Sequence, residues 1–341
     1  MAEIPFVTPL DDPAYGTVVT LSPLVRRVVA NNPSRFSYRG TGTYIVGRGD
    51  VAVIDPGPAL DEHSDALLAA LVGSRVRAIL VTHCHSDHSP LAAWLKKETG
   101  APTIAFGPHG AVETEVDDEG EDDLGDDDGE DGSRSDRDEG LPDAVDGPGD
   151  DLEVIAKETT EVDFIPDIRA VDGSIVAAGR GWTVSAVHTP GHTSNHLCFV
   201  LHEEQALFSG DHVMGWSTTV VSPPDGDMRH YIQSLRKVIA HNDRVLYPTH
   251  GNPITDPQPF LAAYLAHRLE REQQVLAMID SGVGKIRDIV QVLYAQVDPK
   301  LHKAAGRSVL AHIVSLVEDG RVAVADGGPP RSKAAYLAVP L

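Results

Sequence analysis

A dense cluster of metal-ligand side chains lies in a stretch of six residues that reads His-Cys-His-Ser-Asp-His. In an extended segment, residues two apart point to the same side, so His83 and His85 are expected to face one metal ion. Asp87 and His88, where the chain turns into the next element, are then free to face a second ion. Imidazole nitrogens and carboxylate oxygens suit zinc, and also iron or manganese, so the cluster predicts a metal site.

Three further candidate ligands each follow a predicted strand and lie in a turn. They are His192 in Thr-Pro-Gly-His-Thr, Asp211 in Ser-Gly-Asp, and His250 in Pro-Thr-His-Gly. Each would be a weak signal alone. Their order and spacing after the first cluster are what make them candidates for the same site.

Alternating strands and helices must position these residues. Short β-branched runs at 41–46 and 51–54, separated by Gly-Arg-Gly-Asp, predict a hairpin, and the apolar run at 76–82 predicts a strand buried on both faces. A helix is expected over 61–71, and another opens with Ser89 as N-cap and Pro90 in its first turn and closes at Gly100. Further strands are expected at 181–188, 197–201, 205–208 and 245–247, with a helix over 228–241. This pattern predicts a layered α/β domain.

The pattern of predicted elements changes at Pro257, after which three helical segments follow one another without intervening strands. The short run Arg-Val-Ala-Val then predicts a β-ribbon. Three helices and a ribbon are the outline of a winged-helix module. We therefore expect a catalytic domain over residues 1–256 and a winged-helix domain over 257–341.

An acidic insertion at residues 113–151 accounts for most of the net charge. It carries 20 Asp and Glu against two Arg, so 18 of the 23 net negative charges of the chain lie there. Because it is Gly-rich and nearly free of apolar side chains, we expect a disordered surface loop. A cation-binding acidic loop is the alternative, although the Asp and Gly runs do not match the calcium-loop pattern.

Composition excludes several other classes. Cys84 and Cys198 are too few for a disulfide framework and form no Cys-x-x-Cys pair. No apolar stretch is long enough to span a membrane, and the first residues do not read as a signal peptide. A cytoplasmic protein is the expectation.

The histidine and aspartate motifs, over about residues 17 to 255, resemble those of the metallo-β-lactamase superfamily. The resemblance implies an α/β fold, an αββα sandwich with its metals at the edge between the two sheets. It also implies the following ligands: His83, His85 and His192 for one ion, Asp87, His88 and His250 for the other, and Asp211 as the bridge. Asp55, in Ile-Asp-Pro-Gly, resembles the aspartate that orients the histidine loop, and it could equally be a turn residue. Ser89 and Pro90 depart from the glycine pair that many members have there.

A C-terminal winged helix narrows the resemblance to the β-lactamase-like protein 2 group, and the Thr-Pro-Gly-His-Thr segment is similar to that of the glyoxalase II hydrolases. The implied mechanism uses a hydroxide bridging two divalent ions, zinc before iron or manganese, to attack an ester, thioester or phosphodiester. Asp87 and Asp211 are the carboxylates assigned to catalysis. His196 is expected to be a supporting structural histidine, with donation of a proton to the leaving group as its alternative role.

Three function classes stay open at this point. One is a hydrolase of small esters or thioesters, and another is a single-strand endoribonuclease whose winged helix helps to hold RNA. The last is a non-enzymatic DNA-binding protein. Residues 257–341 carry 10 Lys and Arg against 8 Asp and Glu, which is weak for a phosphate-binding face. The winged helix could instead be a packing module or form a homodimer.

Overall fold

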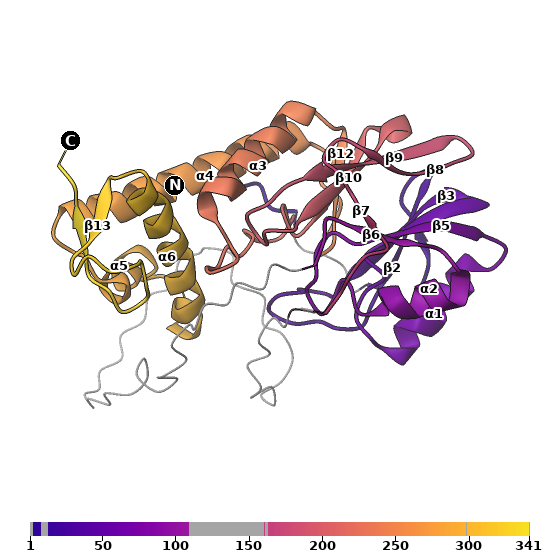
Figure 1. Ribbon diagram of the computed structural model, residues 1–341, viewed down its shortest axis with the longest axis horizontal. Helices are drawn as coiled ribbons and strands as arrows, with labels where there is room; N and C mark the ends of the chain where they lie inside the picture. Colours follow the sequence, from indigo (N-terminus) through magenta and orange to yellow (C-terminus); the bar gives the residue numbers. More distant parts are fainter. Residues whose placement is uncertain (1–2, 8–12, 109–159, 161–162, 298, 341) are drawn as a thin grey trace, which may run out of the picture. The chain divides into compact units, whose positions relative to one another are not determined.

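The computed structural model describes residues 3–7, 13–108, 160, 163–297 and 299–340 of the chain (Figure 1). The predicted disordered loop at 113–151 lies outside these residues. None of the described helices combines the length and the apolar character that crossing a membrane would require.

Within the described residues, the N-terminal half of the fold is a seven-stranded sheet in the order β1 to β7. Its strands are β1 Val19–Thr20, β2 Val25–Val29, β3 Gly42–Arg48, β4 Asp50–Ile54, β5 Arg75–Leu80, β6 Thr103–Ala105 and β7 Ile168–Arg169. β3 and β4 are antiparallel and pair Tyr44 with Ile54, so the predicted hairpin is confirmed. β4 and β5 are parallel, as are β5 and β6, and the connections between them are α1 Asp61–Leu71 and α2 Leu91–Thr99.

The second sheet has five strands among the described residues, in the order β12-β11-β10-β9-β8. They are β8 Ile175–Gly179, β9 Trp182–His188, β10 Leu197–Leu201, β11 Ala206–Gly210 and β12 Val245–Pro248. A short 3-10 turn, η1 His202–Glu204, joins β10 to β11, and α3 Met228–His241 joins β11 to its parallel partner β12.

Three apolar clusters define the layers. Between the sheets lie large side chains of both, among them Tyr44, Phe199 and Phe208. The other face of the first sheet packs against α1 and α2, for example through Leu67 and Leu95. The outer face of the second sheet packs against α3 and the first half of α4 Pro257–Asp280. Helix, sheet, sheet and helix therefore stack in that order, which confirms the αββα sandwich (Figure 1).

Local sequence explains two of the helix ends that position the site. α3 begins after Asp227, whose side chain accepts a hydrogen bond of 2.8 Å from the backbone N–H of His230. α2 ends at Gly100 in the left-handed conformation, as predicted. Its predicted start is wrong, because Pro90 rather than Ser89 holds the cap position, with no side-chain capping bond.

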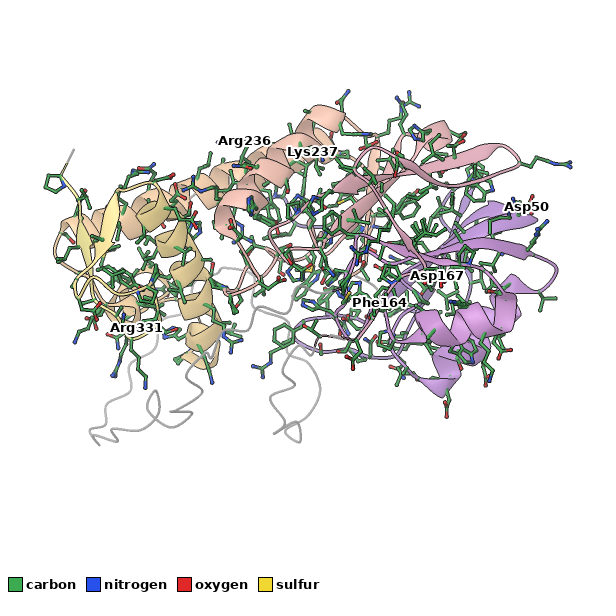
Figure 2. All side chains as sticks on the ribbon, in the orientation of Figure 1. Asp50, Phe164, Asp167, Arg236, Lys237 and Arg331 are labelled. Carbon is green, nitrogen blue, oxygen red and sulfur yellow. The ribbon has the colours of Figure 1, made fainter. Side chains whose placement is uncertain are left out.

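The outward face of α3 is charged. Arg236 and Lys237 are both exposed there (Figure 2), and Lys237 pairs with Asp172 at 2.7 Å. The opposite face of the helix, with Tyr231 and Leu235, is fully buried on the second sheet. This amphipathic pattern is why the helix was predictable from the sequence.

The C-terminal elements form a core of their own. They are the second half of α4, α5 Ile286–Leu293, the 3-10 turn η2 Pro299–Leu301, α6 His302–Glu318, β13 Val322–Val324 and β14 Tyr336–Ala338. β13 and β14 pair as an antiparallel ribbon, so the winged-helix outline is confirmed. α4 contributes to this core and also to the cluster on the second sheet. The domain boundary at 256/257 therefore stays a prediction.

Candidate metal centre

The loop between β5 and α2 brings its first two histidines together. His83 and His85 are both buried, and Nε2 of His83 lies 2.9 Å from Nδ1 of His85. Their rings meet edge to face, with centroids 4.4 Å apart. The chain then turns, because the backbone N–H of His88 donates to the carbonyl of His85 at 3.0 Å. The two imidazoles thus face one point, as the alternation of an extended segment predicts.

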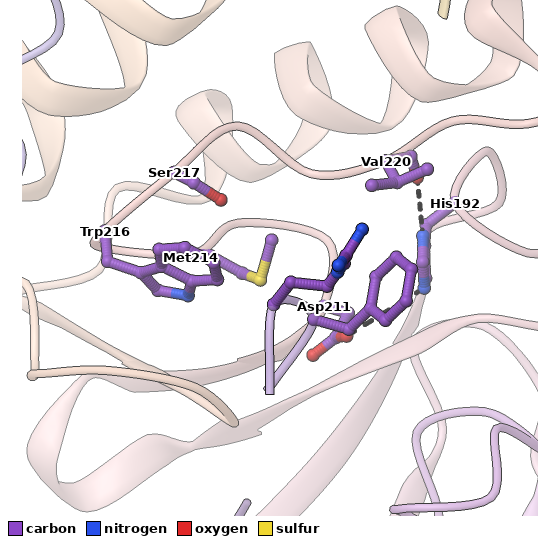
Figure 3. A pocket seen from close by; sticks show the side chains of 8 residues that line it. His192, Asp211, Met214, Trp216, Ser217 and Val220 are labelled. Carbon is purple, nitrogen blue, oxygen red and sulfur yellow. Dashed lines mark hydrogen bonds and ion pairs between the residues drawn. The ribbon is translucent and has the colours of Figure 1, made fainter. Parts of the chain in front are cut away.

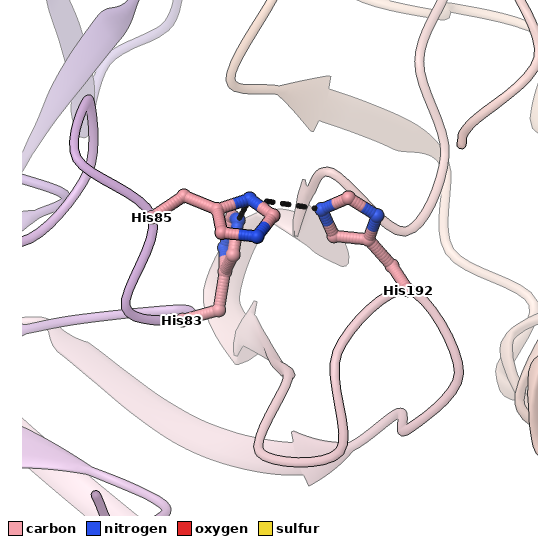
Figure 4. A group of neighbouring side chains, drawn as sticks. All are labelled: His83, His85 and His192. Carbon is pink, nitrogen blue, oxygen red and sulfur yellow. Dashed lines mark hydrogen bonds between the residues drawn. The ribbon is translucent and has the colours of Figure 1, made fainter. Parts of the chain in front are cut away.

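His192 joins these two histidines from the turn after β9 (Figure 4). Its Nε2 lies 3.3 Å from Nδ1 of His85, while its Nδ1 donates to the carbonyl of Val220 at 2.7 Å. Because a carbonyl oxygen can only accept, the proton of a neutral His192 is on Nδ1, and Nε2 carries a lone pair. One ligand atom from each of His83, His85 and His192 lies within 4.8 Å of the other two.

A second group gathers around Asp87. Nε2 of His250 lies 3.2 Å from Oδ2 of Asp87, and Nε2 of His88 lies 3.4 Å from Oδ1. Thr41 donates to Oδ2 of the same carboxylate at 2.9 Å. His250 also donates from Nδ1 to the carbonyl of Gly40 at 3.2 Å, which directs its Nε2 inward. The ligand atoms of Asp87, His88 and His250 again lie within 4.8 Å of one another.

Asp211 lies between the two groups. Its Oδ1 is 3.6 Å from Nε2 of His88, and its Oδ2 is 3.5 Å from Nε2 of His250 and 4.0 Å from Nε2 of His192. The residue follows β11 directly, after Gly210, whose φ is +52°. A Cβ at Gly210 would come within 2.6 Å of Nε2 of His196, so this close approach requires glycine. Asp211 is therefore in contact with members of both groups.

The donor set fits a divalent cation. Within the described residues, Nε2 of His88 and Oδ1 of Asp211 are buried without a hydrogen-bond partner. Buried polar atoms normally have one, because leaving one unsatisfied costs about 1–3 kcal/mol. Both atoms point into the same cluster of nitrogens and carboxylate oxygens, the ligand types that zinc, iron and manganese accept. The cluster is able to hold metal.

The buried charges act strongly on one another. Burial alone would lower the pKa of His88, but the carboxylates of Asp87 and Asp211 outweigh it and raise that pKa well above its ordinary value. Burial alone would also lower the pKa of His250, but Asp211 and Asp87 raise it to about 10. Despite burial, His88 and His250 hold the pKa values of both carboxylates below their usual range. The carboxylates thus stay ionised and need positive charge beside them, from protons or from a metal cation.

Asp55 supports the histidine loop. Its Oδ1 accepts from the backbone N–H of Thr82 at 2.8 Å, and its Oδ2 accepts from the Thr82 hydroxyl at 2.8 Å. Oδ2 also lies 2.9 Å from Nδ1 of His88 and accepts from the Thr249 hydroxyl at 3.3 Å. The side chain is 1% exposed and links the loops that carry His83, His88 and His250. These contacts are the ones that an aspartate orienting the histidine loop would make.

His196 has a structural position. It is fully buried, its Nδ1 lies 2.8 Å from the Thr189 hydroxyl, and its Nε2 accepts from the backbone N–H of Asp211 at 3.2 Å. Burial first, and then the neighbouring histidines His212 and His192, keep its pKa well below the ordinary value. Both ring nitrogens are therefore engaged inside the fold, where they position the backbone of Asp211. This geometry leaves no proton directed at a leaving group.

Helix α4 reaches the centre from the C-terminal side. The Tyr264 hydroxyl accepts from the backbone N–H of Thr219, and Arg268 donates from Nη2 to the carbonyl of the same residue. The next carbonyl, that of Val220, is the acceptor of His192. Arg268 is 3% exposed and lies over the rings of Tyr231 and Tyr264, at 5.1 and 5.7 Å from their centroids. Two α4 side chains thus fix the loop that orients a candidate ligand.

A small pocket opens beside His192 and Asp211 (Figure 3). Besides these two, its lining consists of Arg35, Phe36, Met214, Trp216, Ser217 and Val220. Arg35, Phe36, Met214, Trp216 and Val220 were not predicted as site residues, and neither were Arg268 and Tyr264. The sequence offers no motif for them, because their roles depend on how separate loops meet in the fold. The seven predicted ligands, by contrast, are all brought together.

Comparison with known proteins identifies both parts of the chain. Residues 39–250 match the family described as Metallo-beta-lactamase superfamily, and residues 286–329 match the Beta-lactamase associated winged helix domain. An atrochrysone carboxyl ACP thioesterase from Aspergillus novofumigatus is 31% identical over 321 residues, which cover 89% of this chain and 82% of the relative. Another, from a Cryptosporiopsis species, is 29% identical over 330 residues, with 91% and 85% covered.

Two solved structures share the fold over nearly the whole length. A metallo-beta-lactamase family protein from Thermus thermophilus has a TM-score of 0.67 at 22% identity, covering 94% of this chain and all of its own. A beta-lactamase domain protein from Burkholderia ambifaria has a TM-score of 0.69 at 20% identity, covering 98% and 97%. The fold and the relatives identify the protein as a hydrolytic enzyme. With a matched family domain spanning most of the sandwich, the chain belongs to the metallo-beta-lactamase superfamily.

Proposed function

We propose that this protein is a thioester hydrolase that depends on two divalent metal ions, zinc before iron or manganese. The observation that carries the proposal is the convergence of seven side chains from four separate loops at one edge of the sandwich. The proposed ligands are His83, His85 and His192 for one ion, and Asp87, His88 and His250 for the other, with Asp211 shared. The catalytic domain is proposed to span residues 1–256.

Two such ions would supply activation of water to hydroxide near neutral pH and polarisation of the attacked carbonyl. The chain's own residues prepare the site for this chemistry. Asp211, buried between the groups, would set their separation. Asp87, whose side chain is 21% exposed, would be the carboxylate nearest to incoming water and substrate. Asp55 and the carbonyl of Val220 would hold His88 and His192 with Nε2 directed inward.

A thioester substrate is favoured by the relatives, since several of them are named as thioesterases acting on an acyl carrier protein. We propose that the substrate here is likewise an acyl group on a carrier thiol, cleaved by water to the free acid and the thiol. The family and the relatives named as thioesterases favour a hydrolase over a non-enzymatic DNA-binding protein. Neither the RNA substrate nor the homodimer gains support.

A side-by-side assay tests this function. Metal-loaded protein is incubated with acyl thioesters of N-acetylcysteamine and of an acyl carrier protein, with the matching oxygen esters, and with labelled single-stranded RNA. His85→Ala serves as the blank, because it removes a proposed ligand without touching the pocket lining. Thioester cleavage that is absent in the blank supports the proposal. Cleavage of RNA but not of thioesters would overturn it.

A further inference from the structure

The pocket beside His192 and Asp211 has the composition of a binding site for an apolar group. Four of its eight lining residues are apolar, namely Phe36, Met214, Trp216 and Val220. Ser217 adds a hydroxyl (Figure 3). Small-molecule sites are typically apolar, with a few polar groups that fix the orientation of the ligand. Because two candidate metal ligands form one wall, an acyl group held here would have its carbonyl beside them.

The wall formed by Trp216 is rigid. Its indole stacks on the Tyr38 ring, with centroids 4.6 Å apart and planes inclined by 8°. It also packs on Gly251, the neighbour of His250, where a Cβ would lie 3.3 Å from Cδ1 of Trp216. The stack therefore joins the loop around Tyr38 to the loop after Asp211.

Arg35 is held at the pocket by a tight turn. Ser34 and Tyr38 form an antiparallel bridge, and the Ser34 hydroxyl accepts from the backbone N–H groups of Phe36 and Ser37 at 3.1 and 3.0 Å. Arg35 and Phe36 thus occupy a turn whose two ends are fixed, one by this network and one by the stack of Tyr38 on Trp216. The base of the Arg35 side chain is positioned before any ligand arrives.

The guanidinium of Arg35 has no acidic partner in the part of the chain that the structure describes. It is exposed and forms no hydrogen bond or ion pair there, even with Asp211 on the same pocket wall. Among the described residues lining the pocket, it is the one side chain with a permanent positive charge. A planar guanidinium matches a carboxylate with two parallel hydrogen bonds, so the available partner is an anionic ligand.

We propose that this pocket is the acyl subsite and that Arg35 selects acyl thioesters whose apolar acyl chain carries a carboxylate. This inference rests on the proposed thioesterase function and adds the class of acyl group. The pocket has a volume of only about 30 Å³, so its apolar walls would contact the part of the acyl chain next to the carbonyl, and Arg35 would bind the far, charged end of the chain. An anionic group on the carrier, such as a phosphate, would offer similar oxygens, so the test separates the two sources.

The test compares two acyl groups of equal length, hexanoyl and adipoyl, on N-acetylcysteamine, which carries no phosphate. The wild-type enzyme is expected to prefer adipoyl in kcat/KM. Arg35→Ala should lower kcat/KM for adipoyl about 10- to 100-fold, the range for losing a charge-assisted hydrogen bond, and change it less than about 3-fold for hexanoyl. Arg35→Glu should reverse the preference, and Arg35→Lys should restore part of it.

Arg180→Glu is the matched control, because Arg180 is also exposed and lies outside this pocket. Its replacement changes the net charge of the protein by the same amount as Arg35→Glu. The substrate preference of Arg180→Glu should equal that of the wild type. If Arg35→Glu lowers kcat/KM equally for the hexanoyl and adipoyl substrates, the proposal is overturned. It is also overturned if the substitution affects only hexanoyl-coenzyme A, which carries phosphates but no carboxylate on its acyl group.

Binding of the uncleavable amide analogues, in which nitrogen replaces the thioester sulfur, gives a readout that does not need turnover. Calorimetry should show tighter binding of the adipoyl analogue to the wild type, lost in Arg35→Glu. If this preference is present but no thioester is cleaved, the proposed function fails and the subsite stands. If thioesters are cleaved without any preference that depends on Arg35, the subsite fails and the function stands.

Discussion

The Oδ2 atom of Asp55 lies 2.9 Å from Nδ1 of His88, and both side chains are buried. A carboxylate can only accept, so His88 donates from Nδ1. In the neutral imidazole, Nε2 is therefore the free acceptor, and it faces Asp87 and Asp211 at 3.4 and 3.6 Å. One residue in the turn after β4 thus sets the tautomer of a candidate ligand in the loop after β5.

Asp55→Asn should weaken metal binding while the fold is kept. The amide preserves the shape of the side chain but removes the charge that holds the proton of His88 on Nδ1. Loss of such a supporting group typically costs about 10- to 100-fold in metal affinity or activity. Titration of the demetallated protein with zinc against a chromogenic chelator measures the affinity. The control Asp65→Asn, at an exposed position on α1, should leave the zinc affinity unaltered. An unchanged zinc affinity in Asp55→Asn would contradict the orienting role of Asp55.

Tyr264→Phe and Arg268→Met should reduce turnover although neither residue lines the pocket. Both side chains hold Thr219, beside the carbonyl that orients His192. We expect kcat to fall about 10-fold or more with little change in KM, together with weaker binding of the metal ion that His192 would hold. Arg236→Met, on the exposed face of α3, is the control. Wild-type kcat and metal affinity in both α4 variants would show that the helix only packs.

The two cysteines should be inert in the folded protein. Cys84 and Cys198 are both fully buried, and burial raises the pKa of the Cys198 thiol to about 12. The thiolate is the reactive form, so a disulfide reagent such as Ellman's should react at pH 8 only when guanidinium unfolds the chain, and then with both thiols. Rapid reaction of either thiol under native conditions would contradict the burial of Cys84 and Cys198.

Binding of metal should stabilise the protein. At a free metal concentration 100 times the dissociation constant, one bound ion adds about 2.7 kcal/mol if the unfolded chain does not bind it. For a domain of this size that corresponds to a rise in Tm of roughly 5–10 °C. Thermal unfolding in the presence of zinc or of a chelator measures the difference. An identical Tm in the two conditions, for protein shown to be metal-free at the start, would oppose a metal site.

Much of the fold follows from local patterns in the sequence. α1 and α3 begin and end at the predicted residues, because each has a clear amphipathic repeat. The start of α2 was wrong by one position, since proline after serine suggested a cap that the backbone does not use. Strand β2, which lies between β1 and β3, and the short strand β6 were not predicted at all, because runs this brief carry no reliable period.

The same contrast holds at the site. The candidate ligands could be predicted because His-x-His-x-Asp-His concentrates rare side chains, and the later turns repeat recognisable local sequences. Arg268 and Arg35 could not be predicted from the sequence. One occupies an ordinary helical position, and the other lies in a polar loop. Only the tertiary contact of Arg268 with Thr219, and the place of Arg35 on the pocket wall, give these two residues a role.

The most direct test measures metal content and thioester hydrolysis on the same preparations, by plasma mass spectrometry and a thiol-release assay. We expect about two divalent ions per chain in the active protein. Activity should fall below about 1% of its starting value after chelation and return when zinc, iron or manganese is restored, with the effective metal identifying the native one. Asp211→Ala should hold fewer ions and stay inactive at any metal concentration. A demetallated preparation that hydrolyses thioesters as fast as the loaded one would rule out metal-dependent hydrolysis at this site.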